Sequence, residues 1–499
     1  MIKLKKRFSA VLMSISSLPS PFGIGDFGKG AKDFLKLLSE MGFSAWQVLP
    51  FNPLDFGNSP YGSHSAFAGN YLYIDPIYLY KKNYISNEEL QNAKYIGSPY
   101  TVDYSAVKKS KFKILKAAFE NAKADLLPEL QTFMQENDWV RDYALYMSIK
   151  ETNGMLPFTE WDNELKNYNS ALKHENEYKD KMLFYAFEQY IFSLQYNELK
   201  KYAEDLKIAI IGDIPIYVAP DSVDVWKNPE LFDLNDDYSP RKVAGVPPDA
   251  FSSDGQLWGN PVYLWKNHIS TDFEWWMSRL KRTFELYDVV RIDHFRGFSS
   301  YYSVDADAEN AVHGNWEFAP GSELFKKVLS EIDKERIIAE DLGTLSADVT
   351  ALLNETEIRG MRVIQFGFAD GNSMHLPHNY AENCVAYIGT HDNNTLLGWL
   401  WELNDTDRKN ALDYCGFKDG NWGDGGYYSK SCRAVIETVW KSSAAGAVIP
   451  FQDLCGYGCD ARMNIPGVAD NNWRFRTTED VFGEIDKKYY KKINELYFR

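Results

Sequence analysis

Short apolar runs that end in polar residues recur along the whole chain. Most are separated by stretches with helical periodicity, such as residues 31–41 and 323–332. Eight runs are found: Ala10–Ile15, Ala45–Leu49, Ile208–Asp213, Val289–Asp293, Ile337–Glu340, Met361–Phe366, Cys384–Ile388 and Ala447–Pro450. Apolar strands that alternate with amphipathic helices predict a parallel sheet covered on both faces. Eight such units predict an α/β fold, a closed (β/α)8 TIM barrel with large, mainly helical insertions.

The spacing of the runs is uneven. About 160 residues separate the second run from the third and carry helical patterns, which is too long for a barrel loop. We therefore expect a barrel built from 1–60 and 206–499, with 61–205 as a largely helical insertion. Residues 215–267 are rich in Pro and Gly, so we expect a long irregular segment that covers the active site.

Charge and hydropathy narrow the classes of partner. The chain has 54 basic and 70 acidic residues and a formal net charge of −16, which repels nucleic acid and anionic lipid. No uninterrupted apolar run approaches the ~18 residues of a membrane span. We expect a soluble protein without a nucleic-acid or membrane partner, present as a monomer or a weak homo-oligomer.

The cysteines and the N-terminus bear on the compartment. Five cysteines are an odd number, and the spacing of Cys455 and Cys459 fits neither a zinc site nor a redox motif, so we expect idle or buried thiols. The basic start and the apolar patch at 8–13 could mimic a signal peptide. Serines interrupt the patch and no clear cleavage site follows, so we interpret it as a strand and expect a cytoplasmic protein.

Acidic residues stand at the ends of several predicted strands. Asp213 ends the third run, Asp293 the fourth and Glu340 the fifth, and His391 and Asp392 follow the seventh. The carboxyl ends of barrel strands open on one face, where the catalytic groups of such enzymes lie. These acids should therefore share one rim, although they are far apart in sequence.

Arg291 and Asp293 stand two residues apart on a predicted strand, so their side chains point the same way. A guanidinium beside a carboxylate keeps it ionised and orients it, as a nucleophile requires. A strand-end salt bridge is the alternative interpretation.

Glu340 follows three apolar residues, where burial and a nearby anionic Asp293 would raise its proton affinity, as a general acid requires. Glu340 could instead cap the next helix, and neighbouring Asp341 is a rival for either role. Asp392 could merely belong to a polar turn or a helix N-cap.

Two carboxyl groups about 5–5.5 Å apart would allow one to attack a sugar anomeric carbon while the other protonates the leaving oxygen. The reaction would then retain the anomeric configuration through a covalent glycosyl-enzyme. A third acid would bind ring hydroxyls. Tyr61, Phe251 and Trp258 in the expected loops offer apolar faces to pyranose rings.

Several segments resemble the signatures of the α-amylase clan, and specifically of its 4-α-glucanotransferase family, which includes amylomaltase. They are Val-Val-Arg-Ile-Asp-His-Phe-Arg-Gly at 289–297, Ile-Ile-Ala-Glu-Asp-Leu-Gly at 337–343, Thr-His-Asp-Asn at 390–393 and Ile-Gly-Asp-Ile-Pro at 211–215. Supporting segments include Ser-Pro-Tyr-Gly at 59–62 and Arg-Met-Asn-Ile-Pro-Gly at 462–467. The resemblance runs from about residue 9 to 476.

The resemblance implies roles for individual residues. Asp293 would be the nucleophile, Glu340 the acid/base and Asp392 the stabiliser of the transition state. The substrate-binding residues would be Tyr61, Asp213, Phe251, Trp258, Arg291, His294, Asp370, His391 and Asn464, with Asp370 and Asn464 at outer positions. No cofactor or metal is implied, and residues 235–237 are interpreted as a turn rather than a calcium loop.

The implied reaction moves α-1,4-glucan segments from a maltooligosaccharide or starch-type donor to the 4-hydroxyl of another glucan or glucose. A retaining α-glucan hydrolase with the same acids is the nearest alternative, and the acids cannot separate the two. A sugar-binding barrel without turnover and a metal-dependent barrel enzyme are more distant alternatives.

Overall fold

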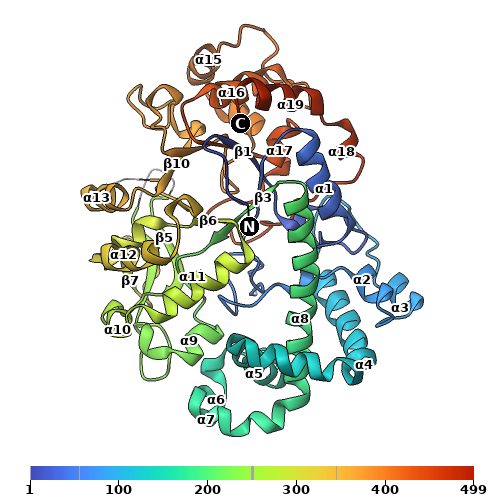
Figure 1. The fold of residues 1–499 in the computed structure, drawn as a ribbon. Coiled ribbons are helices and arrows are strands. Elements are labelled where there is room, and N and C mark those ends of the chain that lie inside the picture. The colour runs from blue at the N-terminus through green and yellow to red at the C-terminus, as the bar shows by residue number, and fades with distance from the viewer. Residues whose placement is uncertain (1, 56, 249–251, 344–345) are drawn as a thin grey trace.

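Eight parallel strands close into a barrel at the centre of the molecule (Figure 1). The computed structural model describes residues 2–55, 57–248, 252–343 and 346–499. The barrel strands, in chain order and in order around the barrel, are β1 (Phe8–Leu12), β2 (Ala45–Gln47), β3 (Ala209–Ile214), β6 (Val289–Ile292), β9 (Ile337–Ala339), β10 (Arg359–Val363), β11 (Cys384–Tyr387) and β12 (Gly446–Pro450). Each matches one of the eight predicted runs, so the predicted (β/α)8 barrel is confirmed.

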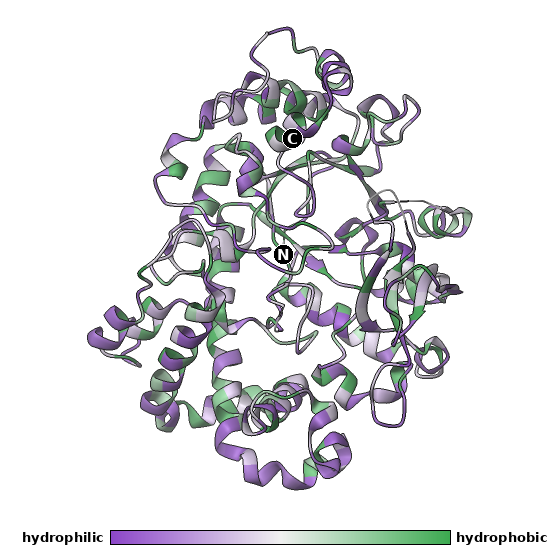
Figure 2. Ribbon diagram, turned by 180° about the vertical axis from the view of Figure 1, so that it is seen from behind, coloured by the Kyte–Doolittle hydropathy of each residue, from purple (hydrophilic) through white to green (hydrophobic). Residues whose placement is uncertain are grey.

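The barrel strands are almost wholly buried, as their apolar sequences require. The helices around them carry one apolar stripe each. Helix α1 (Lys29–Glu40), for example, buries Phe34, Leu35 and Leu38 and exposes Lys36 and Glu40. Hydrophilic residues are concentrated on the peripheral helices (Figure 2). Further helices of the barrel part are α11 (Glu274–Leu286), α12 (Gly321–Glu331), α13 (Ala347–Thr356), α14 (Leu396–Glu402), α15 (Asp405–Tyr414), α16 (Lys430–Lys441), α17 (Phe451–Leu454), α18 (Val481–Glu484) and α19 (Lys487–Leu496).

The segment between β2 and β3 is mainly helical. It contains α2 (Pro76–Lys81), α3 (Asn87–Asn92), α4 (Tyr104–Glu136), α5 (Asp138–Thr152), α6 (Asn163–Lys166), α7 (Tyr168–Ala171) and α8 (Glu175–Asp205). Helix α8 runs from α5 back to the barrel (Figure 1). Its Tyr196 hydroxyl donates to the Leu286 carbonyl of α11 at 2.6 Å. The last helix of this segment therefore also packs on the barrel wall.

A second sheet stands beside the barrel. It is antiparallel, with the order β5 (Gln256–Pro261), β4 (Lys242–Val246), β7 (Ser300–Asp305), β8 (Asn315–Phe318). Residues 215–267, expected to be irregular, thus contain two strands as well as α9 (Val223–Lys227) and α10 (Trp265–Ser270). The pattern did not predict β4 and β5 because Pro and Gly residues interrupt this segment, and because β4 also pairs with β7, about 60 residues later.

Four of the five cysteines are buried as free thiols and Cys459 is exposed. Burial raises the pKa of Cys384 and Cys415 to about 11, so these thiols are inert at neutral pH. The expectation of buried or idle thiols agrees with this placement. Residues 235–237 form the predicted turn, in which Asp237 accepts hydrogen bonds from the backbone and hydroxyl of Ser239.

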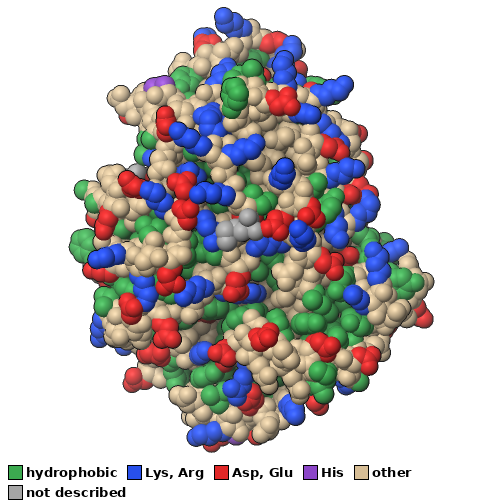
Figure 3. Space-filling model, in the orientation of Figure 1, with side chains coloured by type: hydrophobic (Ala, Val, Ile, Leu, Met, Phe, Trp, Pro, Cys, Tyr) green, Lys and Arg blue, Asp and Glu red, His purple; other side chains and the backbone are tan. Residues whose placement is uncertain are grey.

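Acidic and basic side chains are interspersed on the face that Figure 3 shows. Within the described ranges, no helix is long and apolar enough to cross a membrane.

Candidate active site

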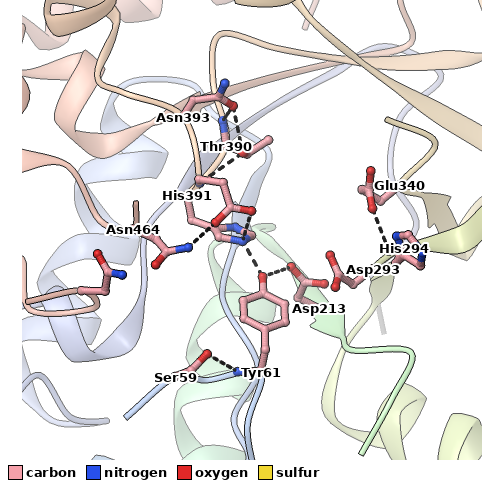
Figure 4. A network of polar contacts seen from close by, with 12 residues as sticks. Ser59, Tyr61, Asp213, Asp293, His294, Glu340, Thr390, His391, Asn393 and Asn464 are labelled. Carbon is pink, nitrogen blue, oxygen red and sulfur yellow. Dashed lines mark hydrogen bonds and ion pairs between the residues drawn. The ribbon is translucent and has the colours of Figure 1, made fainter. Parts of the chain in front are cut away.

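The predicted acids meet at the carboxyl ends of the barrel strands (Figure 4). Asp293 directly follows β6 and Glu340 directly follows β9, and these strands pair in register through Ile292 and Ala339. Neighbouring strands lie about 4.8 Å apart, so the two carboxyl groups start from adjacent positions on the rim. Two carboxyl groups that act on one glycosidic bond must lie near each other, which adjacent strand ends allow.

Arg291 joins two of the acids. Its Nη1 donates to both carboxylate oxygens of Asp213, at 2.8 and 2.7 Å, and its Nη2 forms an ion pair with Asp293 at 2.9 Å. Asp213 lies opposite Arg291 in the pairing of β3 with β6, which brings the two side chains together. The salt bridge considered as an alternative is therefore present, and it leaves the Asp293 side chain 28% exposed.

Glu340 is held in place by the backbone. Its carboxylate accepts hydrogen bonds from the N–H groups of His294 at 2.7 Å and Leu342 at 2.9 Å. Burial raises the pKa of Glu340 to about 7, and the negative charge of Asp293 adds to the rise while Arg291 opposes it. Burial raises the pKa of Asp293 too, but the direct ion pair with Arg291 offsets part of that rise. The direct ion pair with Arg291 favours the ionised form of Asp293, whereas Glu340 is held by backbone N–H groups.

The rival acid, Asp341, points away from the rim. It is buried, accepts a hydrogen bond from the Met361 N–H at 2.5 Å and forms an ion pair with Arg362 at 2.8 Å. Successive residues at a strand end point to opposite sides, so only one of the two neighbouring acids can face the rim. Glu340 has that position.

Asp392 is surrounded by hydrogen-bond donors. His391 Nε2 lies 3.3 Å from its carboxylate, and Asn464 Nδ2 donates to it at 2.6 Å. Burial would raise the pKa of Asp392, but His391 and Asn464 outweigh burial and lower the pKa to about 2. Asp392 is therefore ionised at neutral pH. The polar turn considered as an alternative also exists, because Asn393 accepts hydrogen bonds from the backbone and hydroxyl of Thr390.

Tyr61 connects the two halves of the site. Its hydroxyl donates to Asp213 at 2.9 Å and lies 3.3 Å from His391 Nδ1 (Figure 4), and its ring stacks on His391 with centroids 5.0 Å apart. Trp473 lies against both rings, at 5.8 Å from Tyr61 and 5.7 Å from His391. Sequence reasoning missed Trp473, because it follows no strand and only the fold brings it to the site.

Trp258, on β5, stands edge to face with His294, with ring centroids 4.8 Å apart, and Tyr217 lies beside it. Burial lowers the pKa of His294 to about 3, so its ring is neutral. The second sheet thus brings an indole ring to the residue that directly follows Asp293.

Phe251 and Asp370 are the remaining predicted binding residues. Phe251 lies outside the described residues. Asp370 is exposed in the loop after β10 and accepts a hydrogen bond from Asn372 of its own turn at 3.1 Å. In the part of the chain that the structure describes, it makes no hydrogen bond or ion pair with the three acids.

The site combines an oriented carboxylate, a carboxyl group that keeps its proton near neutral pH and a third, ionised acid. Such a set can carry out nucleophilic and acid/base chemistry on one bond. Within the residues described, no cluster of three His, Cys, Asp or Glu could hold a metal ion.

Comparisons with known proteins find relatives over nearly the whole chain. The family model described as 4-alpha-glucanotransferase matches residues 13–480. The 4-alpha-glucanotransferase of Aquifex aeolicus is 45% identical over 498 residues, which cover 99% of each chain. That of Thermus thermophilus is 40% identical over 508 residues, covering 98% of each chain.

The solved structure of the Streptococcus agalactiae amylomaltase in complex with acarbose superposes with a TM-score of 0.94 at 39% identity and covers 99% of both chains. The match of the family model over nearly the whole length, the high identity to these relatives and the shared barrel establish that the chain belongs to the 4-alpha-glucanotransferase family.

Proposed function

We propose that this enzyme transfers α-1,4-glucan segments by a retaining double displacement in which Asp293 is the nucleophile and Glu340 the acid/base. The observation that carries the proposal is the contrast between two adjacent carboxyl groups. Asp293 has a direct ion pair with Arg291, whereas Glu340 accepts hydrogen bonds from two backbone N–H groups and burial raises its pKa to about 7. Two neighbouring acids in different electrostatic surroundings can provide one nucleophile and one proton donor.

In the first step, an Asp293 oxygen attacks the anomeric carbon of a donor glucan. The glycosidic bond breaks, and the leaving oxygen takes the proton of Glu340. The products are a glycosyl ester on Asp293 and a shortened glucan with a free 4-hydroxyl. Arg291 and Asp213 hold Asp293 in the attacking orientation throughout.

In the second step, Glu340 is ionised and acts as a base. It takes the proton of the 4-hydroxyl of an acceptor glucan or glucose, whose oxygen attacks the anomeric carbon and releases Asp293. Two displacements at one carbon retain its configuration. Water in place of the sugar would give hydrolysis, and we assign to Trp258, beside His294, the role of favouring a sugar acceptor over water.

We assign the remaining residues to the sugar that carries the breaking bond. Asp392, ionised and anchored by Asn464, accepts hydrogen bonds from ring hydroxyls and stabilises the oxocarbenium-like transition state. His391, Tyr61 and His294 line the same sugar, Phe251 is proposed to line the sugar path, and Asp370 is proposed for an outer position.

We further propose that the enzyme acts in the cytoplasm on maltooligosaccharides or on chains derived from glycogen or starch. Its buried free thiols are typical of proteins from reducing compartments. We also propose 61–205 as an insertion subdomain of the barrel.

Incubation with maltotriose tests the proposed function. Transfer gives a ladder of longer oligosaccharides together with glucose, because each glycosyl group released from one donor extends another. Chromatography of the products over time separates the alternatives. Maltose and glucose without longer products would mean hydrolysis and would contradict the proposal, as would a complete lack of turnover.

The pKa values predict a bell-shaped pH profile for kcat/KM. The first step needs Glu340 protonated, so activity should fall as pH rises through about 7. It also needs Asp293 ionised, so activity should fall on the acid side at a pH above the usual range of an aspartate. Initial rates with maltotriose from pH 4 to 9 measure both limbs, and an alkaline limb near the ordinary pKa of a glutamate would contradict the assignment of Glu340.

A further inference from the structure

Two large aromatic side chains are exposed on β8, at an edge of the second sheet. Trp316 is 46% exposed and Phe318 is 80% exposed. They are two residues apart on a strand, so they stand on the same face, about 6.6 Å apart along the chain. Edge strands of soluble proteins normally avoid exposed hydrophobic side chains, because these promote association. Such a pair therefore indicates a binding surface.

The other face of β8 is fixed to the sheet by Glu317. Its carboxylate accepts hydrogen bonds from Lys242 at 2.8 Å, Tyr301 at 3.0 Å and Ser303 at 2.5 Å. These donors come from β4 and β7 and hold the strand in one register. The aromatic pair is thus presented on a rigid support, which reduces the entropy that a ligand would lose on binding.

Trp316 adjoins the segment that carries the proposed nucleophile. The guanidinium of Arg296 lies over the Trp316 ring, 4.2 Å from its centroid. Arg296 follows Asp293 by three residues, and Glu340 is one of the two carboxyl groups whose charge acts on it. Through Arg296, the aromatic surface adjoins the short 3-10 helix Phe295–Phe298 that follows Asp293.

The chemistry of the surface fits a sugar chain. Flat aromatic rings offer apolar faces to pyranose rings, and the partly buried cation beside Trp316 disfavours a purely apolar or cationic partner. The sheet that carries Trp316 also carries Trp258, the indole that stands beside His294. The same sheet therefore places one indole beside His294 and a second indole on its edge strand β8.

We propose that Trp316 and Phe318 form an outer binding surface for an α-1,4-glucan on the leaving-group side of the cleft. A chain that extends several units beyond the breaking bond contacts these rings, whereas maltotriose is too short to use them fully. The surface thereby sets a preference for long glucans. The inference rests on the proposed function and adds chain-length selection to it.

The test compares kcat/KM for linear amylose with kcat/KM for maltotriose in the intact enzyme. Trp316→Ala should lower the ratio of the two by about tenfold, mainly through KM for amylose, because stacking contributes binding energy in the ground state as well as the transition state. Phe318→Ala should lower it by a smaller factor. Trp316→Phe, which keeps a flat ring, should restore most of the ratio.

Phe498→Ala is the matched control. Phe498 is 82% exposed, and the adjacent Arg499 contacts the Phe8 carbonyl at the amino end of β1, on the opposite end of the barrel from the acids. Its replacement should leave the ratio unchanged. An unchanged ratio in Trp316→Ala, or an equal fall in Phe498→Ala, would overturn the inference.

Light scattering of the wild type and Trp316→Ala tests whether a second copy of the chain, and not a glucan, covers β8. If the wild type is an oligomer and Trp316→Ala a monomer, the surface is an interface between copies and the inference is wrong; identical masses support it. An inactive wild type would contradict the proposed function. If the wild type is active and Trp316→Ala has the same ratio of kcat/KM for amylose to kcat/KM for maltotriose, this inference alone is contradicted.

Discussion

Asp293→Asn is expected to lower kcat by about four orders of magnitude or more, because an amide cannot form the glycosyl ester on which both steps depend. Asparagine has nearly the same shape, and Arg291 keeps both hydrogen bonds to Asp213. The fold should therefore persist, and thermal melting followed by circular dichroism should give a Tm close to that of the wild type. Steady-state rates with maltotriose measure the loss.

A glycosyl fluoride makes this prediction sharper. Fluoride leaves without protonation, so a maltooligosyl fluoride bypasses the need for an acid but not the need for a nucleophile. Asp293→Asn should remain inactive with this donor. If the variant retains a tenth or more of the wild-type rate with either donor, Asp293 is not the nucleophile.

Glu340→Gln is expected to lower kcat with maltotriose by about three orders of magnitude or more, since the glycosidic oxygen then leaves without a proton. The His294 and Leu342 N–H groups donate to different carboxylate oxygens, so the single amide oxygen of glutamine retains one of these hydrogen bonds and loses the other. With a maltooligosyl fluoride the first step should recover, and the second step, which lacks its base, should become limiting. A glycosyl group should then accumulate on Asp293 and be detectable by mass spectrometry of the peptide.

Asp341→Asn is the matched control for the neighbouring acid. Asp341 forms a buried ion pair with Arg362, so its replacement should lower Tm while the folded enzyme keeps activity with maltotriose far above that of Glu340→Gln. A glycosyl fluoride that rescues Asp341→Asn but not Glu340→Gln would reverse the assignment of the acid.

Sequence reasoning located the barrel because each strand is a short apolar run with helical periodicity on either side, and both signals are local. The ends of the predicted runs differ from the ends of the strands by a few residues. The run that ends at Ile15 stops as a strand at Leu12, and the run that ends at Phe366 stops at Val363, because short 3-10 helices follow both. The acids could be found for the same reason, since each stands where an apolar run ends.

Other parts of the site depend on contacts between distant segments. Trp473 reaches Tyr61 and His391 only because the chain beyond β12 returns to the rim. Trp258 lies on β5, which pairs with β4, and β4 also pairs with β7. Strand β6 of the barrel lies between β4 and β7 in the sequence. Asp370, which the resemblance assigns to an outer binding position, accepts a hydrogen bond from Asn372 within its own turn.

The sequence by itself determined the number and order of the barrel strands and the acidic residues at their ends, because hydrophobic periodicity is a property of neighbouring residues. The tertiary structure alone decided which carboxyl group faces the rim and what surrounds it. Glu340 and Asp341 are adjacent in the chain, yet the first lies beside Asp293 and the second pairs with Arg362. Their separate roles follow from strand register and burial, which are set only when segments far apart in the sequence pack together.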